Sequence, residues 1–546
     1  MLPLQRLTKR ISAVPHEITR HFDHEGEWLW NDALQRRCRH VKFNVDALCN
    51  ISTSVVGAQK CVRFESFAQG AYNKLFLLGF DNGAEAIARI SSPLVGNLHM
   101  STASEVATME YVREVFGEPT PRVLAWSRTP KLRAAVESDF ILMERVHGVS
   151  LEDRWLNTFD ADMGALLKDL ISFDIHLHGR FFSQIGSLFF KEDVSPELRD
   201  RPLYLKEEHN TEPAAQKYRI GPVVDKQYWF NEYVEGDRGP WLDMTSFIQT
   251  TCRLAHCKAE SQAASASSSH PRPSSLLSRS KPHDLPELRR LLQQCISLAP
   301  YLNPSEPALT APRLTHPDLS RSNILVAPTG AANVQSYIDW QGAMTLPYIQ
   351  GAIISPAVLY GGNLIPLPDD PFSMPAMPPD TDISPELQEQ ANLELRLAKR
   401  HQLTSSVLLR RAPLCLATAC VPHAQLLASL PETALRCYAD GPQNLRHLVR
   451  QLCDAWPFDM DEAAECPIQL SSEDITRDEE DYPAFVRYQQ RKDEYRGHIQ
   501  CDPDGRMPEE HVDAMRRNWV VARQKWNEEE VSPFPFQDGM WSFHLT

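Results

Sequence analysis

Residues 316–323 and the segment that follows them constrain the fold of this 546-residue chain more than any other stretch. The two short apolar runs 323–326 and 334–338 have the length and composition of β-strands. Between them, residues 327–333 are rich in turn formers. The pattern therefore predicts an antiparallel hairpin that follows a polar loop.

Folding this hairpin about Ala331 sets Asn323 opposite Asp339, with Asp318 just upstream in the loop. One carboxamide and two carboxylates then gather at the open end of the hairpin. Hard oxygen ligands of this kind suit Mg²⁺ and a phosphate. The alternative is an ordinary hairpin with polar ends.

The order His316, Asp318, Asn323 and Asp339 resembles the catalytic core of the aminoglycoside phosphotransferase and choline kinase family. That family has the protein-kinase-like fold. The resemblance implies an α+β, bilobal architecture, with a small antiparallel β-sheet N-lobe containing one helix and a larger, mainly helical C-lobe. It also implies that Asp318 orients and deprotonates a substrate hydroxyl and that His316 braces the loop. Asn323 and Asp339 would hold Mg²⁺ against the phosphates of ATP.

The N-terminal third contains a second hairpin, with expected strands at 61–68 and 73–80 and a turn at 69–72. It resembles the phosphate-covering hairpin of the family. Gly70, which lets the backbone approach a nucleotide, and Asn73 are the candidate nucleotide contacts. With a single glycine, a plain β-hairpin remains the alternative.

The strand expected at 85–90 ends near Arg89, at the position where the family normally has a lysine that pairs with phosphates. Arginine can bind phosphate through two parallel hydrogen bonds, although it is bulkier than lysine and directs its donors differently. The alternative is a surface arginine on a strand.

A helix is expected at 104–116, capped by Ser101 or Thr102 and closed at Gly117. Glu105 would lie in its first turn. The resemblance makes Glu105 the ion-pair partner of Arg89. The alternative is a carboxylate that is favoured by the helix dipole.

Two further strands are expected at 121–126 and 139–144, and the second resembles the hinge strand of the family. The resemblance places the adenine of ATP against the backbone near Met143 and Glu144.

Composition narrows the functional class. The net charge is −15, and no basic cluster is interleaved with aromatic residues, which argues against nucleic-acid binding. No apolar run approaches the length of a membrane span. The 12 cysteines are dispersed, and their spacing fits reduced thiols better than a disulfide scaffold or a zinc site.

The chain divides into four expected parts. Residues 1–20 have basic residues and no acid before His16, as in a mitochondrial presequence. The remaining parts are 21–145 (N-terminal extension and N-lobe), 146–430 (helical C-lobe, with an insert at 191–300, a flexible stretch at 260–283 and the catalytic loop at 315–341) and 431–546 (helical C-terminal extension packing on the body). Helices are expected at 160–177, 285–302, 386–409, 432–452 and 481–498, an extended proline-dense stretch at 366–379, and a tail at 534–543 that packs back onto the body.

Several outer motifs together are similar to the fungal phosphotransferase-like proteins named for altered inheritance of mitochondria. They are residues 43–46, 102–108, 239–241, 315–318, 338–341 and 536–540. This resemblance implies a mitochondrial location, and the cytoplasm is the alternative.

The sequence thus predicts an ATP- and Mg²⁺-dependent kinase that acts on a hydroxyl of a small molecule. A protein substrate is disfavoured because Ser320 stands where protein kinases have a lysine. The acidic balance suits a cationic amino-alcohol or amino-sugar, and no protein partner can be named. The alternative function is a catalytically silent, nucleotide-binding pseudokinase that serves as a mitochondrial maintenance or assembly factor.

Overall fold

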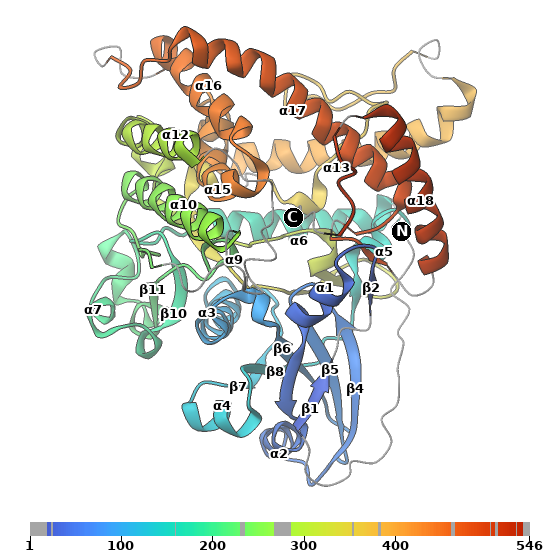
Figure 1. Ribbon diagram of the computed structural model, residues 1–546. Helices are drawn as coiled ribbons and strands as arrows, with labels where there is room; N and C mark the ends of the chain where they lie inside the picture. Colours follow the sequence, from blue (N-terminus) through green and yellow to red (C-terminus); the bar gives the residue numbers. More distant parts are fainter. Residues whose placement is uncertain are drawn as a thin grey trace.

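The computed structural model describes residues 19–22, 26–158, 160–229, 235–266, 285–351, 354–379, 384–459, 465–502, 504–507, 511–530 and 532–538. The expected presequence lies outside these residues, except for Thr19 and Arg20, which open the first strand. The chain forms two lobes, a smaller one built on a sheet and a larger one built mainly of helices (Figure 1). The expected α+β, bilobal architecture, with an antiparallel sheet in the smaller lobe and a mainly helical larger lobe, is confirmed.

A five-stranded antiparallel sheet in the order β4-β5-β6-β8-β7 forms the smaller lobe. Side chains alternate between its two faces. Ile87 and Met143 belong to the apolar cluster of the larger lobe, whereas Ala88 and Leu142 pack on the outer face. The strands are Cys61–Gln69 (β4), Asn73–Phe80 (β5), Glu85–Ser91 (β6), Val123–Trp126 (β7) and Phe140–Glu144 (β8), close to the expected positions.

The N-terminal extension covers the outer face of the sheet. Four aromatic rings, from Phe22, Phe43, Phe64 and Phe76, lie with their centroids within 6.4 Å of one another and close this small core. The elements here are Thr19–Phe22 (β1), Glu27–Trp28 (β2), Asp32–Arg39 (α1), Val41–Asn44 (β3), Val45–Val55 (α2) and Pro130–Val136 (α4).

The smaller lobe carries α1, α2 and α4 as well as α3 (Leu98–Tyr111), so the expectation of a single helix in this lobe is wrong. Helix α3 begins earlier than expected. Its cap is Asn97, whose side chain accepts a hydrogen bond from the Met100 amide, so the expectation of a cap at Ser101 or Thr102 is wrong. A π-helical turn, Val112–Phe116, continues the helix to Gly117, which has a φ of 71°. The expected end of the helix is confirmed.

The larger lobe places α6 (Asp160–His178) beside a small sheet in the order β14-β13-β9. The elements around it are Val149–Ser150 (β9), Leu151–Trp155 (α5), Pro312–Thr315 (β12), Ile324–Val326 (β13), Val334–Tyr337 (β14) and Met344–Pro347 (β15). The 3₁₀ helices are Pro93–Val95 (η1), Lys191–Asp193 (η3), Glu207–Thr211 (η4), Ala299–Tyr301 (η5), Pro307–Leu309 (η6), Arg321–Asn323 (η7), Tyr348–Gln350 (η8), Pro356–Val358 (η9) and Pro385–Leu387 (η10).

The insert carries its own strand pair and two long helices. Residues 260–266 of the expected flexible stretch form the end of helix α10, and 267–284 lie outside the described residues. The helix expected at 285–302 ends at Leu298. The elements are Ser187–Phe190 (β10), Pro196–Arg199 (α7), Pro213–Lys217 (α8), Tyr218–Gly221 (β11), Lys226–Trp229 (α9), Met244–Ala266 (α10) and Leu285–Leu298 (α12).

Helices also form the C-terminal part of the chain. The single helix expected at 432–452 is wrong, because Gly441, with a φ of 97°, and Pro442 divide it into two. The proline-dense stretch 366–379 contains no helix or strand, as expected. The elements are Gln388–Arg411 (α13), Pro413–Ala419 (α14), Ala424–Asp440 (α15), Gln443–Asp459 (α16), Ser472–Ile499 (α17), Arg506–Met507 (β16) and Val512–Glu529 (α18).

The C-terminal tail packs back onto the body, as expected for the part that the structure describes. Phe534 and Phe536 are buried with Trp30 and Trp526 in one cluster. All twelve cysteines are free thiols. Among the described residues, no single helix is long and apolar enough to cross a membrane. Helices α14 and α15, which meet at 83°, have sufficient length and apolar composition only when they are taken together.

Candidate active site

His316 holds the loop that follows β12. Its Nε2–H donates to the Ile338 carbonyl (3.0 Å), and its Nδ1 accepts from the Asp318 amide (3.1 Å). Burial lowers the pKa of His316 to about 4, so the ring is neutral and can both donate and accept. The ring also meets Trp340 edge to face at a centroid distance of 4.4 Å. His316 therefore links the catalytic loop to the strand that leads to Asp339.

Asp318 and Asn323 are held together. The Asn323 side-chain amide donates both to the Asp318 carbonyl (2.9 Å) and to its carboxylate Oδ2 (3.1 Å). Both of these hydrogen bonds use Nδ2 of Asn323, so its Oδ1 is left to accept a hydrogen bond or to bind a cation. Among the described residues, no donor to that oxygen is found. One carboxylate and one carbonyl-type oxygen therefore share the end of the hairpin.

The hairpin register differs from the expected one by one residue. Ile324 pairs with Tyr337, and a bulge after Leu325 changes the register, so the Asn323 carbonyl accepts from the Ile338 amide (3.0 Å). The expectation that Asn323 stands opposite Asp339 is therefore wrong. Asp339 lies one residue further on, in the left-handed region with a φ of 66°, and its side chain is 47% exposed.

Arg89 and Glu105 form a buried ion pair between Nη1 and Oε1, with the side chains 5% and 1% exposed. The second guanidinium nitrogen, Nη2, lies 3.2 Å from Asp339 Oδ1. Burial lowers the pKa of Arg89, and the Asp339 carboxylate opposes this effect. Because α3 begins at Leu98, Glu105 lies in the middle of the helix, and the helix-dipole explanation for this carboxylate is wrong.

Asn73 ties the two lobes together. Its Nδ2 donates to Gln341 Oε1 (3.0 Å), and its Oδ1 accepts from the Ser91 hydroxyl (2.8 Å). Gln341 in turn donates to the Ser91 hydroxyl (3.1 Å). This network occupies both ends of the Asn73 amide, so its part in nucleotide binding would be to position the turn before it.

The backbone at Gly70 is open to close approach by a ligand. A β-carbon built there would meet nothing closer than the Asn73 carbonyl at 3.9 Å, and the residue needs no positive φ. The packing of the protein therefore does not demand a glycine at this position. The open space above the turn is what a phosphate group would fill.

The hinge places Met143 on the inner face of the sheet, in the cluster shared with Ile87. The Glu144 amide donates to the Arg122 carbonyl (2.9 Å), and its carboxylate pairs with Arg113 (2.8 Å). The Glu144 amide is therefore not open to a base. An adenine at this hinge would need a neighbouring backbone group.

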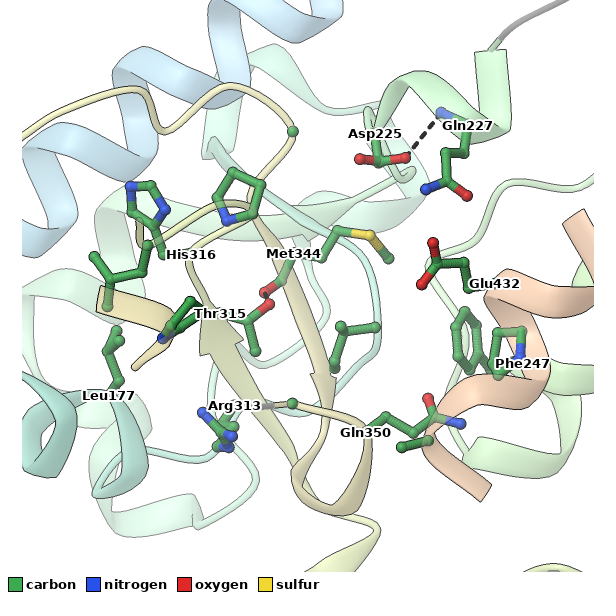
Figure 2. A pocket seen from close by; sticks show the side chains of 18 of the residues that line it. Leu177, Asp225, Gln227, Phe247, Arg313, Thr315, His316, Met344, Gln350 and Glu432 are labelled. Atoms are coloured by element: carbon green, nitrogen blue, oxygen red, sulfur yellow. Dashed lines mark hydrogen bonds between the residues drawn. The ribbon is translucent and has the colours of Figure 1, made fainter. Parts of the chain in front are cut away.

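A pocket of about 440 Å³ opens beside the catalytic loop, on the side of the larger lobe. Figure 2 shows Thr315 and His316 on one side of it, and Asp225 and Glu432 on the other. Apolar side chains also line the pocket, and Phe247 lies beside Glu432. Because Asp225 comes from the insert and Glu432 from α15, the sequence pattern had given no sign that these two carboxylates share a pocket with His316.

Asp174, on α6, is a buried carboxyl that also lines the pocket. It is 4% exposed, and burial raises its pKa to about 7, against the opposing effect of Arg313. Since the folded state binds this proton more tightly than the unfolded state, the contribution of Asp174 to stability falls as the pH rises from about 4 to about 7 and is flat above.

We therefore expect Asp174→Asn to raise the free energy of unfolding by on the order of 3 kcal/mol at pH 8 and by much less at pH 4.5. Denaturant unfolding of both proteins at the two pH values measures this difference. An effect of equal size at both pH values would contradict the raised pKa.

The residues present fit a magnesium ion that is bound together with a nucleotide. Among the described residues, no group of three or more His, Cys, Asp or Glu side chains could hold a metal ion by itself. The candidate ligands are Asn323 Oδ1 and the Asp339 carboxylate. Mg²⁺ is commonly held by one or two protein groups, with phosphate oxygens and water completing its shell.

Curated relatives of the chain are fungal. A subtelomeric hrmA-associated cluster protein of Aspergillus fumigatus is 33% identical over 353 residues, which cover 59% of this chain and 65% of that protein. Altered inheritance of mitochondria protein 9, mitochondrial, of Yarrowia lipolytica is 26% identical over 249 residues (42% and 43%). The protein of that name from Lodderomyces elongisporus is 23% identical over 377 residues (59% and 58%). The matched segments span less than two thirds of these relatives. The expected resemblance to this fungal group is confirmed.

No family model matches the chain. Solved structures similar to it include a thermostable mutant of the aminoglycoside phosphotransferase APH(4)-Ia, with 14% identity and a TM-score of 0.31, covering 74% of this chain and 98% of that one. A putative fructosamine-3-kinase from Thermobifida fusca has 13% identity and a TM-score of 0.32, covering 72% and 99%.

Proposed function

We propose that the protein is an ATP- and Mg²⁺-dependent phosphotransferase that acts on a hydroxyl group of a small molecule. The observation that carries the proposal is the placement of Asp318. Its carboxylate is held by Asn323, at the edge of the pocket that its neighbours Pro317 and Leu319 line, and His316 connects this loop to the strand before Asp339. A carboxylate in this position can accept the proton of a bound hydroxyl.

The other residues have separate roles in this proposal. Asn323 and Asp339 would hold Mg²⁺, which when bound neutralises charge on the nucleotide phosphates. Arg89, fixed by Glu105, would donate hydrogen bonds to a phosphate from its Nη2 edge. The turn at Gly70 would cover the phosphates.

The pocket supports an acceptor that carries positive charge. Asp225 and Glu432 contribute carboxylates, and Phe247 and Tyr228 contribute aromatic surface. Burial raises the pKa of Asp225, and Lys226 and Lys258 oppose this effect. A cationic amino group on the acceptor would offset the burial of the Asp225 carboxylate and would pair with Glu432, whose side chain is 58% exposed. A mitochondrial location is proposed from the names of the relatives.

One observation favours the second candidate, a catalytically silent, nucleotide-binding scaffold. Arg89 replaces the usual lysine, and it already pairs with Asp339 as well as with Glu105. A nucleotide would have to replace the contact between Arg89 and Asp339. A screen of metabolites for ADP release, with the wild type and an Asp318 variant in parallel, separates the two functions, because the scaffold releases no ADP with any acceptor.

Both candidates predict that ATP with Mg²⁺ stabilises the fold. At a ligand concentration of about 100 times Kd, the gain is about 2.7 kcal/mol, which corresponds to a rise in Tm of a few degrees for a chain of this length. ATP without Mg²⁺ should shift the Tm much less, because the negative charge of Asp339 would then face the negative phosphates with no cation between them. Differential scanning fluorimetry measures both shifts. No shift under either condition would contradict nucleotide binding altogether.

A further inference from the structure

The turn that would cover the phosphates is held by two arginines from distant parts of the chain. Arg39 Nε, at the end of α1, donates to the Ala71 carbonyl (3.1 Å). Arg506 Nη1, in the C-terminal extension, donates to the Gln69 carbonyl (3.2 Å). The two accepting carbonyls flank Gly70. An ordinary hairpin turn has no need of two guanidinium groups.

The C-terminal extension is anchored to the smaller lobe at the same place. Strand β16 pairs with β2, so that Arg506 stands opposite Trp28. Asp504 accepts from Arg39 Nη2 (2.8 Å), from Trp28 Nε1 (3.1 Å) and from the Arg506 amide (3.1 Å). One carboxylate thus joins both arginines, and Arg39 is only 2% exposed. This segment connects helices α17 and α18, which pack against each other.

The backbone of the tight turn that carries Asp504 is closely constrained by its neighbours. Gly505 has a φ of 86°, and a β-carbon there would lie 2.8 Å from the Trp30 ring. The Gly505 carbonyl accepts from the Leu29 amide (2.9 Å). The position of Arg506 is therefore set by close packing rather than by a flexible tail.

The contact to Arg39 also orients a backbone donor. In a planar trans peptide, the carbonyl and the following N–H point in opposite directions. Because the Ala71 carbonyl faces Arg39, the Tyr72 N–H faces away from it, and no acceptor for this N–H is found among the described residues. The Tyr72 ring lies against the larger lobe, 4.3 Å from Lys226 Nζ.

We propose that Arg39 and Arg506 are positioning residues for ATP, through which the C-terminal extension holds the turn at Gly70 in the geometry that presents the Tyr72 N–H to the phosphates. The inference rests on the proposed nucleotide binding, but no part of it depends on catalysis. Preorganising the turn lowers the ordering cost of binding, so the effect should fall on the phosphates and not on the base.

The test compares Arg506→Gln, Arg506→Lys and Arg516→Gln in the full chain. Arg516 is the matched control, since it lies in the same extension and pairs with Glu27 of β2 without touching the turn. Affinities for Mg²⁺–ATP and for adenosine are measured by competition against a fluorescent ATP analogue. Hydrogen exchange of peptides covering 66–75 reports on the turn without any nucleotide.

We expect Arg506→Gln to weaken Mg²⁺–ATP binding about tenfold, the loss typical of one hydrogen bond from a charged donor, and to leave adenosine binding within about twofold. Exchange across the turn should rise, and Arg506→Lys should recover most of both effects. Arg516→Gln should behave as wild type.

Equal losses for ATP and adenosine, or no change in either, would overturn the inference, and so would unchanged hydrogen exchange at the turn. If the wild type binds ATP and Arg506→Gln binds it equally well, only this inference falls. A wild-type chain that binds no ATP would overturn the proposed function together with it.

Discussion

Asp318→Asn should lower the rate of phosphoryl transfer by about 10²- to 10⁴-fold, the range that a positioned general base contributes. The reason is that an amide cannot accept the proton of the acceptor hydroxyl. The substitution keeps the size of the side chain and an oxygen that can accept the hydrogen bond from Asn323. The fold and the nucleotide site should therefore remain intact.

The measurement is ADP release with the acceptor that the metabolite screen identifies. The control is the same variant in the thermal-shift experiment, where Mg²⁺–ATP should raise its Tm as much as it raises that of the wild type. Full turnover in the variant would remove Asp318 from the mechanism. If the wild type and the variant restore a null strain equally well, the scaffold function is the better explanation.

Local patterns were enough to predict the loop and the hairpin that carry Asp318, Asn323 and Asp339. Asp318, Asn323 and Asp339 lie within one loop and one hairpin, so strand and turn preferences decide their neighbourhood. The expected turn centre at Ala331 was wrong, since Val326 pairs with Val334, and the bulge after Leu325 removes only part of this offset, so the register at Asn323 differs by one residue. The predicted start of helix α3 was also wrong. Asn97, Ser101 and Thr102 all have side chains that can cap a helix, and the sequence alone does not decide among them.

Contacts between distant segments could not be predicted in this way. Arg506 meets Gln69, and Glu432 shares a pocket with His316, although more than 100 residues separate the partners in each case. Single-sequence patterns describe neighbours along a helix or strand, whereas these contacts depend on how whole elements pack. The pocket beside the 315–319 loop and the arginine contacts to the turn at Gly70 therefore came only from the structure.

Glu105→Gln should reduce the free energy of unfolding by about 3–5 kcal/mol, because it leaves the Arg89 guanidinium buried without its charged partner. The control is Glu110→Gln on the same helix, whose carboxylate pairs with Lys217 at a half-exposed site and should cost less than about 1 kcal/mol. Thermal and denaturant unfolding measure both variants. A cost for Glu105→Gln no larger than that for Glu110→Gln would show that the Arg89–Glu105 pair contributes little to the fold.

Loss of nucleotide binding in Glu105→Gln would not by itself separate a damaged fold from a missing phosphate contact. The double variant Arg89→Met/Glu105→Leu does so, because it removes both buried charges together. Replacing a buried ion pair with apolar side chains of similar volume is often neutral or stabilising, so stability should return to within about 2 kcal/mol of wild type. The Tm shift with Mg²⁺–ATP should stay absent, since no guanidinium then stands beside Asp339. A double variant that regains both stability and the full nucleotide response would show that Arg89 supports the fold alone and that ATP is held without it.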